Sequence, residues 1–281
     1  GPYLVDTLYL DVVPRVSLRG VDAHLIVHHL ESLHPGPSRT SDEVFRAREE
    51  SLLRPFRGFL ATSEFTRDYL VQRGFAAESV VVLRPGVEGF APASPRSTGA
   101  LRVLMVANLI ERKGVLPFLS ELIRVLRPTD AFSLRIVGSP DFEPGYAARC
   151  HAIVAAAPEL EGRVELCGAL PHGAMPGEYQ RADLLVSAAT METFGMALQE
   201  ACAAGLPVLA VEGGYAVHHA QHGSTGLHFA GCGALADGLR RLLDDPAQLA
   251  NLQAGARAAA PGSARSWGVV AQEFLAAFSR G

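Results

Sequence analysis

Two glutamates that flank a glycine are the residues of this sequence best suited to bind a ligand. Glu192 and Glu200 lie on either side of Gly195 in the segment Met-Glu-Thr-Phe-Gly-Met-Ala-Leu-Gln-Glu. A glycine at the first turn of a helix exposes backbone N–H groups that suit a phosphate, and carboxylates beside it accept hydrogen bonds from hydroxyl groups. The segment predicts a ligand whose diphosphate lies between hydroxyl-bearing groups, as in a nucleotide sugar. Alternatively, both glutamates are solvated.

A second candidate site follows the apolar run at residues 101–107, where Arg112 and Lys113 precede Gly114. Lys113 is the one lysine among 25 basic residues, so its presence here is more informative than that of any arginine. Two cations beside a glycine at a strand-to-helix junction can neutralise a diphosphate. The alternative is a solubilising pair at the start of a helix.

Histidines form two further groups. His28 and His29 follow a short apolar run, where a histidine can bond a substrate hydroxyl or carry a proton, although a surface pair is the alternative. His218 and His222 have the spacing of residues on one helical face, which could ligate a metal. Because no carboxylate accompanies them in the pattern of zinc hydrolases, we favour a structural role for this pair.

Several cofactor motifs are absent from the sequence. It contains no Gly-x-Gly-x-x-Gly fingerprint, no phosphate loop ending in Gly-Lys-Ser or Gly-Lys-Thr, and no Gly-x-Ser-x-Gly elbow. It also lacks an Asp-x-Asp pair that could hold a divalent ion on a diphosphate. We therefore expect neither a cofactor nor a metal.

Short apolar runs alternate with helical patterns from residue 101 onward, which predicts a parallel sheet covered on both faces. The expected strands are 101–107, 132–137, 164–167, 183–188 and 207–211, and the expected helices are 116–126, 147–156, 196–203, 233–243, 246–259 and 265–279. Before residue 89 we expect strands at 25–27 and 79–83, and helices near 42–54 and at 64–73, the latter with Ser63 as its N-cap. Residues 89–99 are rich in Pro, Ser and Gly and predict a linker.

The composition excludes several classes of protein. With 48% hydrophobic and 19% charged residues among 281, the chain is globular rather than disordered or fibrous. A net charge of −4 argues against a nucleic-acid partner. No run approaches the ~18 apolar residues of a membrane span. Four cysteines without a Cys-x-x-Cys pair suit the reducing cytoplasm.

Taken together, these motifs resemble those of the family 4 glycosyltransferases, which are retaining, metal-independent enzymes of the GT-B fold. The spacing of Glu192 and Glu200 is similar to the family's Glu-x7-Glu motif, and residues 112–114 are similar to its Arg-Lys-Gly segment. Further similar segments are Leu-Ile-Val-His at 25–28, Thr-Ser-Glu-Phe at 62–65, Arg-Pro-Gly-Val-Glu at 84–88, Gly-Leu-Pro-Val at 205–208 and Gly-Ser-Thr-Gly at 223–226.

The resemblance implies an α/β, GT-B-like architecture with two Rossmann-like, doubly wound parallel-sheet domains. Residues 1–98 would be the C-terminal portion of an acceptor-side domain plus the linker, since they hold too few strands for a whole domain, and we expect the rest of that domain to precede residue 1. Residues 99–281 would be the nucleotide-sugar (donor) domain, with a C-terminal helix near Trp267 that returns toward the first domain.

The resemblance also implies a role for each candidate residue. Glu192 would be catalytic and face the transferred sugar, and Glu200 would bind the ribose hydroxyls. Lys113, with Arg112, would neutralise the departing diphosphate, and His28 would lie near the anomeric carbon as a second catalytic residue. The remaining contacts would be made to sugar and phosphate by Phe194, Gly195 and Met196, and to the base by the loops at Gly138 and Leu170.

The expected function is the transfer of a hexose from a nucleoside diphosphate sugar to an unidentified hydroxyl acceptor, in the cytoplasm. Two alternatives stay open: a nucleotide-sugar epimerase of GT-B type, and a catalytically weak remnant that only binds the nucleotide sugar. Asn108 favours the remnant, because the family commonly has an arginine there. Peripheral membrane contact, through the segment expected before residue 1, also stays open.

Overall fold

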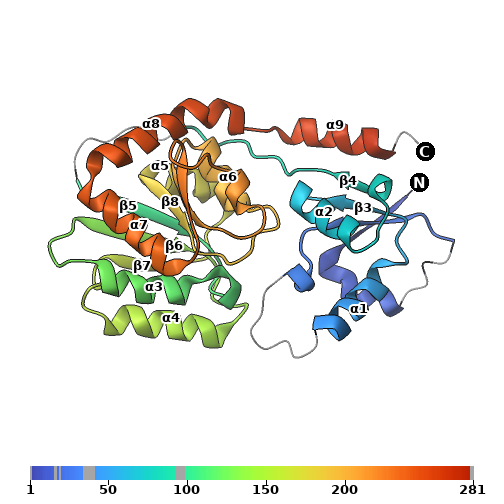
Figure 1. Cartoon of the computed structure of the whole chain (residues 1–281), viewed down its shortest axis with the longest axis horizontal. Coiled ribbons are helices and arrows are strands. Elements are labelled where there is room, and N and C mark those ends of the chain that lie inside the picture. Colours follow the sequence, from blue (N-terminus) through green and yellow to red (C-terminus); the bar gives the residue numbers. More distant parts are fainter. Residues whose placement is uncertain (1, 16–17, 19, 34–41, 93–98, 279–281) are drawn as a thin grey trace. The chain divides into compact units, whose positions relative to one another are not determined.

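The computed structural model describes residues 2–15, 18, 20–33, 42–92 and 99–278. Contacts divide the chain into two compact units, of which the first comprises residues 1–86 and 266–281 and the second residues 87–265. Each unit has its own parallel sheet (Figure 1). The expected linker at 89–99 lies partly outside the described residues, and its described positions group with the second unit.

The first unit has a four-stranded parallel sheet in the order β1-β2-β3-β4. Buried apolar residues of β2 and β3, such as Leu25, Val27 and Leu60, form its core. Ser63 begins the second helix as predicted, since its side chain accepts a hydrogen bond from the Thr66 N–H at 3.2 Å. The elements are β1 (Tyr3–Asp6), η1 (Thr7–Arg15), β2 (Ala23–Val27), η2 (Glu31–Leu33), α1 (Asp42–Leu53), β3 (Gly58–Ala61), α2 (Glu64–Gln72), η3 (Ala77–Ser79) and β4 (Val80–Val82).

The terminal helix α9 (Trp267–Phe278) groups with the first unit. Its first residue packs on the chain just after β4: a Cβ at Gly86 would lie 2.7 Å from the Trp267 ring. Gly86 therefore has no room for a side chain while the indole is in place.

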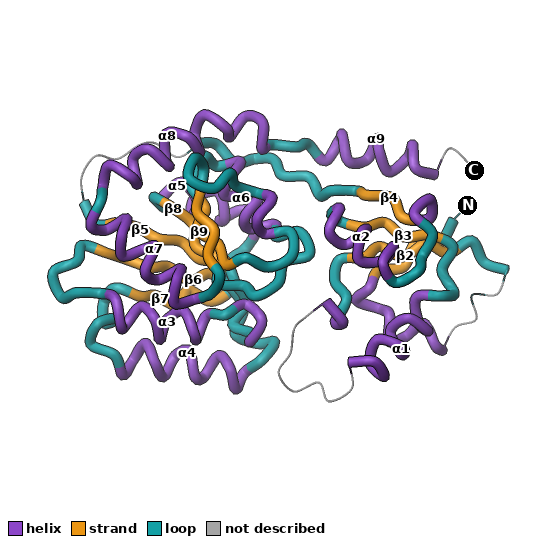
Figure 2. Tube along the Cα trace, in the orientation of Figure 1, coloured by secondary structure: helices purple, strands orange, loops and turns teal. Residues whose placement is uncertain are grey.

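The second unit has a six-stranded parallel sheet in the order β10-β9-β8-β5-β6-β7. Figure 2 shows these strands lying between helices. The chain runs outward from β5 to β7, crosses back to β8 on the other side of β5, and continues outward to β10. The strands are β5 (Leu101–Val106), β6 (Phe132–Val137), β7 (Val164–Gly168), β8 (Leu184–Ser187), β9 (Val208–Val211) and β10 (Gly226–Phe229).

Helices cover both faces of this second sheet. Alternate residues of β5 point to opposite faces, so Val103 and Met105 join one buried cluster and Leu104 joins the other. The first cluster includes residues of α3 (Val115–Val125), α4 (Pro144–Ala156) and α7 (Cys232–Asp244), and the second includes residues of α5 (Met175–Arg181) and α6 (Met196–Ala203). Helix α8 (Pro246–Ser263) contacts α6 and α7.

The sequence predicted most of these elements within a few residues. The strand at 132–137 and the helix at 196–203 have the predicted bounds. The sequence patterns did not predict β1, β3, β10 or the helix α5, which contains Pro176 and Gly177. No helix in the described part of the chain combines the length and apolarity needed to cross a bilayer.

Candidate functional site

The order of the second sheet reverses between β5 and β8, and loops after these two strands bring the main candidate residues together. In open parallel sheets, ligands bind beyond the carboxyl ends of the strands at such a reversal. The loop after β5 carries Arg112, Lys113 and Gly114, and the loop after β8 carries Glu192 and Gly195. The strand order therefore places the two candidate sites, which are far apart in the sequence, at the same edge of the sheet.

Lys113 and Glu192 form an ion pair at this reversal. The Lys113 Nζ lies 2.5 Å from the Glu192 Oε1, and the two side chains are only 18% and 11% exposed. The surrounding backbone is also joined, because the Arg112 carbonyl accepts a hydrogen bond from the Thr190 N–H at 3.1 Å. At this point the lysine can bind an incoming phosphate, and the carboxylate can accept hydrogen bonds from sugar hydroxyls.

Gly114 allows the two loops to approach. It has φ +66°, and a Cβ there would lie 2.2 Å from the Ala188 carbonyl oxygen. An alanine would be strained in this left-handed conformation and would also collide with the β8 loop. The glycine in the Arg-Lys-Gly segment is thus explained by packing.

A pair of glycines after β9, which sequence analysis did not single out, holds Glu192 from the other side. The Glu192 N–H donates to the Gly213 carbonyl at 3.3 Å, and the Tyr215 N–H donates to the Glu192 carbonyl at 2.7 Å. A Cβ on Gly213 or Gly214 would lie within 2.3 Å of a backbone oxygen of the Glu192 loop. A Gly-Gly pair one residue after an apolar strand was the signal that could have identified this support.

Gly195 is the N-cap of α6 and has φ +92°. The first N–H groups of a helix lack partners within it and carry the positive end of its dipole. Phe194 is buried before the turn, whereas Met196 is exposed on the first turn. The loop therefore presents backbone donors next to the Lys113–Glu192 pair.

Glu200 lies one turn farther along α6, where its Oε2 accepts a hydrogen bond of 2.7 Å from the Tyr179 hydroxyl. Burial raises the pKa of Glu200 above its ordinary value, and this hydrogen bond and His172 oppose the shift. Burial, together with the neighbouring Glu200, also raises the pKa of Tyr179. The hydroxyl of Tyr179 therefore stays protonated and fixes the orientation of Glu200, a role that sequence analysis missed.

The loop at Gly138 is close-packed. A Cβ at Gly138 would lie 2.0 Å from the Ala107 carbonyl oxygen, so only glycine fits between the ends of β5 and β6. Asn108, next to it, accepts a hydrogen bond from the Ser139 N–H on its Oδ1 at 3.0 Å. Leu170 is partly buried against the apolar cluster under α5 and α6.

His28 belongs to the first unit and follows β2. Its Nε2 lies 2.9 Å from the Asp6 Oδ2 at the end of β1, and its N–H donates to the Thr7 Oγ1 at 3.2 Å. A carboxylate on one ring nitrogen fixes the orientation of an imidazole. Asp6 was not identified from the sequence because β1 itself was not.

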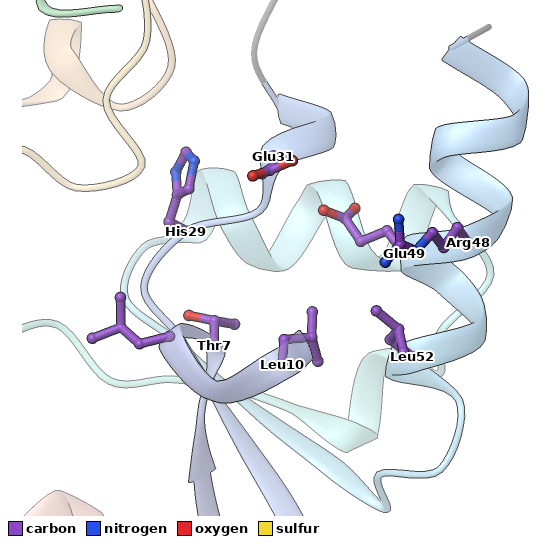
Figure 3. A pocket seen from close by; sticks show the side chains of 8 residues that line it. Thr7, Leu10, His29, Glu31, Arg48, Glu49 and Leu52 are labelled. Atoms are coloured by element: carbon purple, nitrogen blue, oxygen red, sulfur yellow. The ribbon is translucent and has the colours of Figure 1, made fainter. Parts of the chain in front are cut away.

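A pocket of about 360 Å³ lies at the same end of the first sheet (Figure 3). Its side chains come from three segments: Thr7, Leu8 and Leu10 from η1, His29 and Glu31 from the region after β2, and Arg48, Glu49 and Leu52 from α1. Glu49 is buried, and its Oε2 accepts a hydrogen bond from the Arg73 guanidinium at 2.9 Å. The pocket therefore combines an apolar floor with charged groups.

The predicted common helical face of His218 and His222 is wrong. The short helix η6 (Ala216–His218) ends at His218, and the His222 Nδ1 accepts a hydrogen bond from the His228 N–H at 3.0 Å. In the described part of the chain, no group of three or more His, Cys, Asp or Glu side chains is arranged to hold a metal ion.

Residues 89–259 match the family model of the glycosyl transferases group 1. The chain belongs to this family. Glycogen synthase of Mycobacterium tuberculosis is 30% identical over 210 residues, which cover 72% of this chain and 49% of that protein. D-inositol 3-phosphate glycosyltransferase of Nocardia farcinica is 31% identical over 197 residues, or 68% and 42% of the two chains. The chain thus spans about half the length of the curated relatives it matches.

Two solved structures show that the fold is of the GT-B type. Sucrose-phosphate synthase of Thermosynechococcus elongatus has a TM-score of 0.79 and 22% identity, covering 99% of this chain and 73% of that one. HepE of Anabaena, solved in complex with UDP-glucose, has a TM-score of 0.80 and 21% identity, covering 99% and 79%. The predicted α/β architecture with Rossmann-like parallel sheets is therefore confirmed.

Proposed function

We propose that this glycosyltransferase group 1 chain is a retaining, metal-independent enzyme of family 4 that moves a hexose from a nucleoside diphosphate sugar to a hydroxyl acceptor. The observation that carries the proposal is the Lys113–Glu192 ion pair at the sheet reversal, beside the first turn of α6. The names of the relatives and the UDP-glucose in the HepE structure support the donor class.

In this proposal the second unit binds the donor. Lys113 and Arg112 offset the charge of the diphosphate as it departs, which makes a divalent ion unnecessary. Glu192 accepts hydroxyl hydrogen bonds from the sugar, with the Phe194–Met196 backbone between sugar and phosphate. Glu200, oriented by Tyr179, accepts hydrogen bonds from the two ribose hydroxyls. The loops at Gly138 and Leu170 contact the base. The nucleotide sugar is a substrate, and no cofactor takes part.

The first unit supplies the acceptor side. Its pocket beyond β1 and β2 offers hydrogen-bonding side chains over an apolar floor, which suits an acceptor that presents a hydroxyl group. His28, paired with Asp6, is the group we assign to the anomeric carbon. The four cysteines are free thiols, in keeping with a cytoplasmic enzyme.

Calorimetric titration with UDP, GDP and ADP, each without metal, tests the donor site. One nucleotide should bind, and Glu200→Ala should weaken that binding about tenfold or more, since a hydrogen bond to a charged group contributes about 1.5–3 kcal/mol. Glu161→Ala, which removes an exposed carboxylate before β7, is the matched control and should bind like the unaltered chain. Failure of all three nucleotides to bind would contradict the proposal.

Product analysis separates the enzymatic alternatives. With the matching nucleotide sugar and a panel of hydroxyl acceptors, transfer with retained configuration is expected, and Glu192→Ala should abolish it. Conversion of the donor to an epimer in the absence of acceptor would identify an epimerase instead. Tight donor binding without transfer or hydrolysis would identify the catalytically weak form that Asn108 suggests.

A further inference from the structure

His219 lies directly behind the loop that begins α6 and touches it through both ring nitrogens. Its Nε2 lies 2.5 Å from the Phe194 carbonyl oxygen, and its Nδ1 lies 2.9 Å from the Gln199 Oε1. The Cys202 thiol donates to the His219 carbonyl at 3.3 Å, and the Tyr215 and Phe194 rings meet the imidazole edge to face. These contacts hold the imidazole in a single orientation.

The partners of the two ring nitrogens fix its protonation. The Phe194 carbonyl can only accept, so Nε2 must donate a proton. The Gln199 Nε2 donates to the Ser263 carbonyl at the C-terminal end of α8, another group that can only accept. This fixes the Gln199 amide with its oxygen toward His219, so Nδ1 must donate as well. An imidazole that donates from both nitrogens is an imidazolium cation.

The hydrogen bond to Phe194 also sets the direction of the next N–H. In a trans peptide the carbonyl and the following N–H point in opposite directions. Binding the Phe194 carbonyl to His219 therefore turns the Gly195 N–H away from His219, toward the open side of the loop. The position of a Cβ on Gly195 would be 3.4 Å from the His219 Nε2, so the cation lies directly under the glycine.

We propose that His219 is held as an imidazolium and acts as a positioning residue for the donor diphosphate, aiming the Gly195 N–H and placing a positive charge beneath it. This inference rests on the proposed function of the loop. It gives the site a third cation besides Lys113 and Arg112. The ligand class is a nucleoside diphosphate or its sugar ester.

The proposal makes nucleotide affinity depend on pH. The titratable side chains that the described contacts place around His219 are Cys202 on α6, Tyr215 in the loop after β9, and His218, which stacks on Tyr215 with ring centroids 4.7 Å apart. Burial raises the pKa of Cys202 to about 12, so it stays neutral. The backbone carbonyl of Glu192 accepts a hydrogen bond from the Tyr215 N–H, but the Glu192 carboxylate is paired with Lys113. As pH rises and His219 loses its proton, one hydrogen bond and the charge are lost, and affinity should fall.

Nitrogen NMR of the free chain reads the protonation directly. The shifts of the two His219 ring nitrogens, assigned by their disappearance in His219→Gln, should show both protonated at neutral pH. A neutral imidazole, with one nitrogen protonated, would overturn the inference. This measurement needs no ligand, and the variant serves only to assign the signals. If His219→Gln does not fold, His219→Asn takes its place.

Titration with UDP, GDP and ADP between about pH 6 and pH 9 tests the role. The unaltered chain should bind its nucleotide about tenfold more weakly at the alkaline end, which corresponds to about 1.4 kcal/mol. His219→Gln retains a donor for Phe194 without the charge, so it should bind weakly and show a flat profile. His218→Gln, which changes the exposed neighbouring histidine at the end of η6, is the matched control and should keep the profile of the unaltered chain.

The outcomes separate the two proposals. If the unaltered chain binds none of the nucleotides, the proposed function fails and the positioning role fails with it. If it binds one with an affinity that neither pH nor His219→Gln changes, the function stands and the role of His219 is refuted. If His219→Gln weakens binding but retains a sloping profile, the residue is merely structural and the inference is also overturned.

Discussion

The ion pair between Lys113 and Glu192 should lower the affinity of the free chain for a nucleoside diphosphate. In the free chain each charge already has a partner at 2.5 Å. A diphosphate must therefore compete with Glu192 for the Lys113 ammonium, and it also meets the negative charge of Glu192. Glu192→Gln removes both obstacles and keeps the size of the side chain. We expect this variant to bind the free nucleoside diphosphate more tightly, while sugar transfer is lost.

The geometry of the pair sets the magnitude. Unit charges 2.5 Å apart interact by about 7 kcal/mol at an effective dielectric constant of 20, and by about 2 kcal/mol in water. Desolvation and side-chain ordering offset most of this, so exposed pairs contribute about 0.2–1 kcal/mol, and breaking a buried pair costs about 3–5 kcal/mol. The side chains here are 18% and 11% exposed. A coupling of about 1–2 kcal/mol, or a five- to thirtyfold gain in affinity, is the expectation.

Calorimetry with the nucleotide that the chain binds is the assay, using the nucleotide without its sugar. Lys113→Met should shift the affinity in the opposite direction, by about tenfold or more. Glu161→Gln changes the net charge by the same amount at an exposed position and should leave affinity unchanged, which separates the local pair from total charge. Equal or weaker nucleotide binding by Glu192→Gln would refute the competition.

Three further predictions concern the framework around the site. Gly114→Ala should destabilise the second unit by about 3 kcal/mol or more, because the alanine would adopt φ +66° and its Cβ would lie 2.2 Å from the Ala188 carbonyl oxygen. Urea unfolding measures this loss, and unchanged stability would contradict the packing. Tyr179→Phe removes the donor to Glu200 and should cost about 1.5–3 kcal/mol of unfolding free energy at neutral pH, with a smaller loss at acid pH, where the carboxyl is protonated. Because burial raises the pKa of Glu200, the folded chain binds the Glu200 proton more tightly than the unfolded chain does, so the free energy of unfolding falls as pH rises through the folded-state pKa. Glu200→Gln should remove this fall from the pH profile of unfolding. The same profile in the variant as in the unaltered chain would refute the contribution of Glu200.

Local patterns in the sequence were enough to predict much of the second unit. The strand at 132–137 and the helix at 196–203 have the predicted bounds. In the strand, Phe132, Leu134 and Ile136 are buried at alternate positions, which is the pattern of a strand packed on a core. The local patterns also placed Glu192 in a loop and Glu200 on a helix. The weaker patterns failed: β3 has only four residues, and α5 begins with Pro and Gly inside its first turn, which obscures a helical pattern.

By itself, the sequence determined the α/β class, the family resemblance, and the identities of the candidate residues. Their spatial relations came from the tertiary structure. Lys113 and Glu192 are 79 residues apart in the chain, and they meet because the sheet order puts β5 beside β8. The protonation of His219 depends on Phe194, Gln199 and the end of α8, which folding brings to one place. Strand order and hydrogen-bond partners arise from long-range packing, which residue types and short spacings do not encode locally.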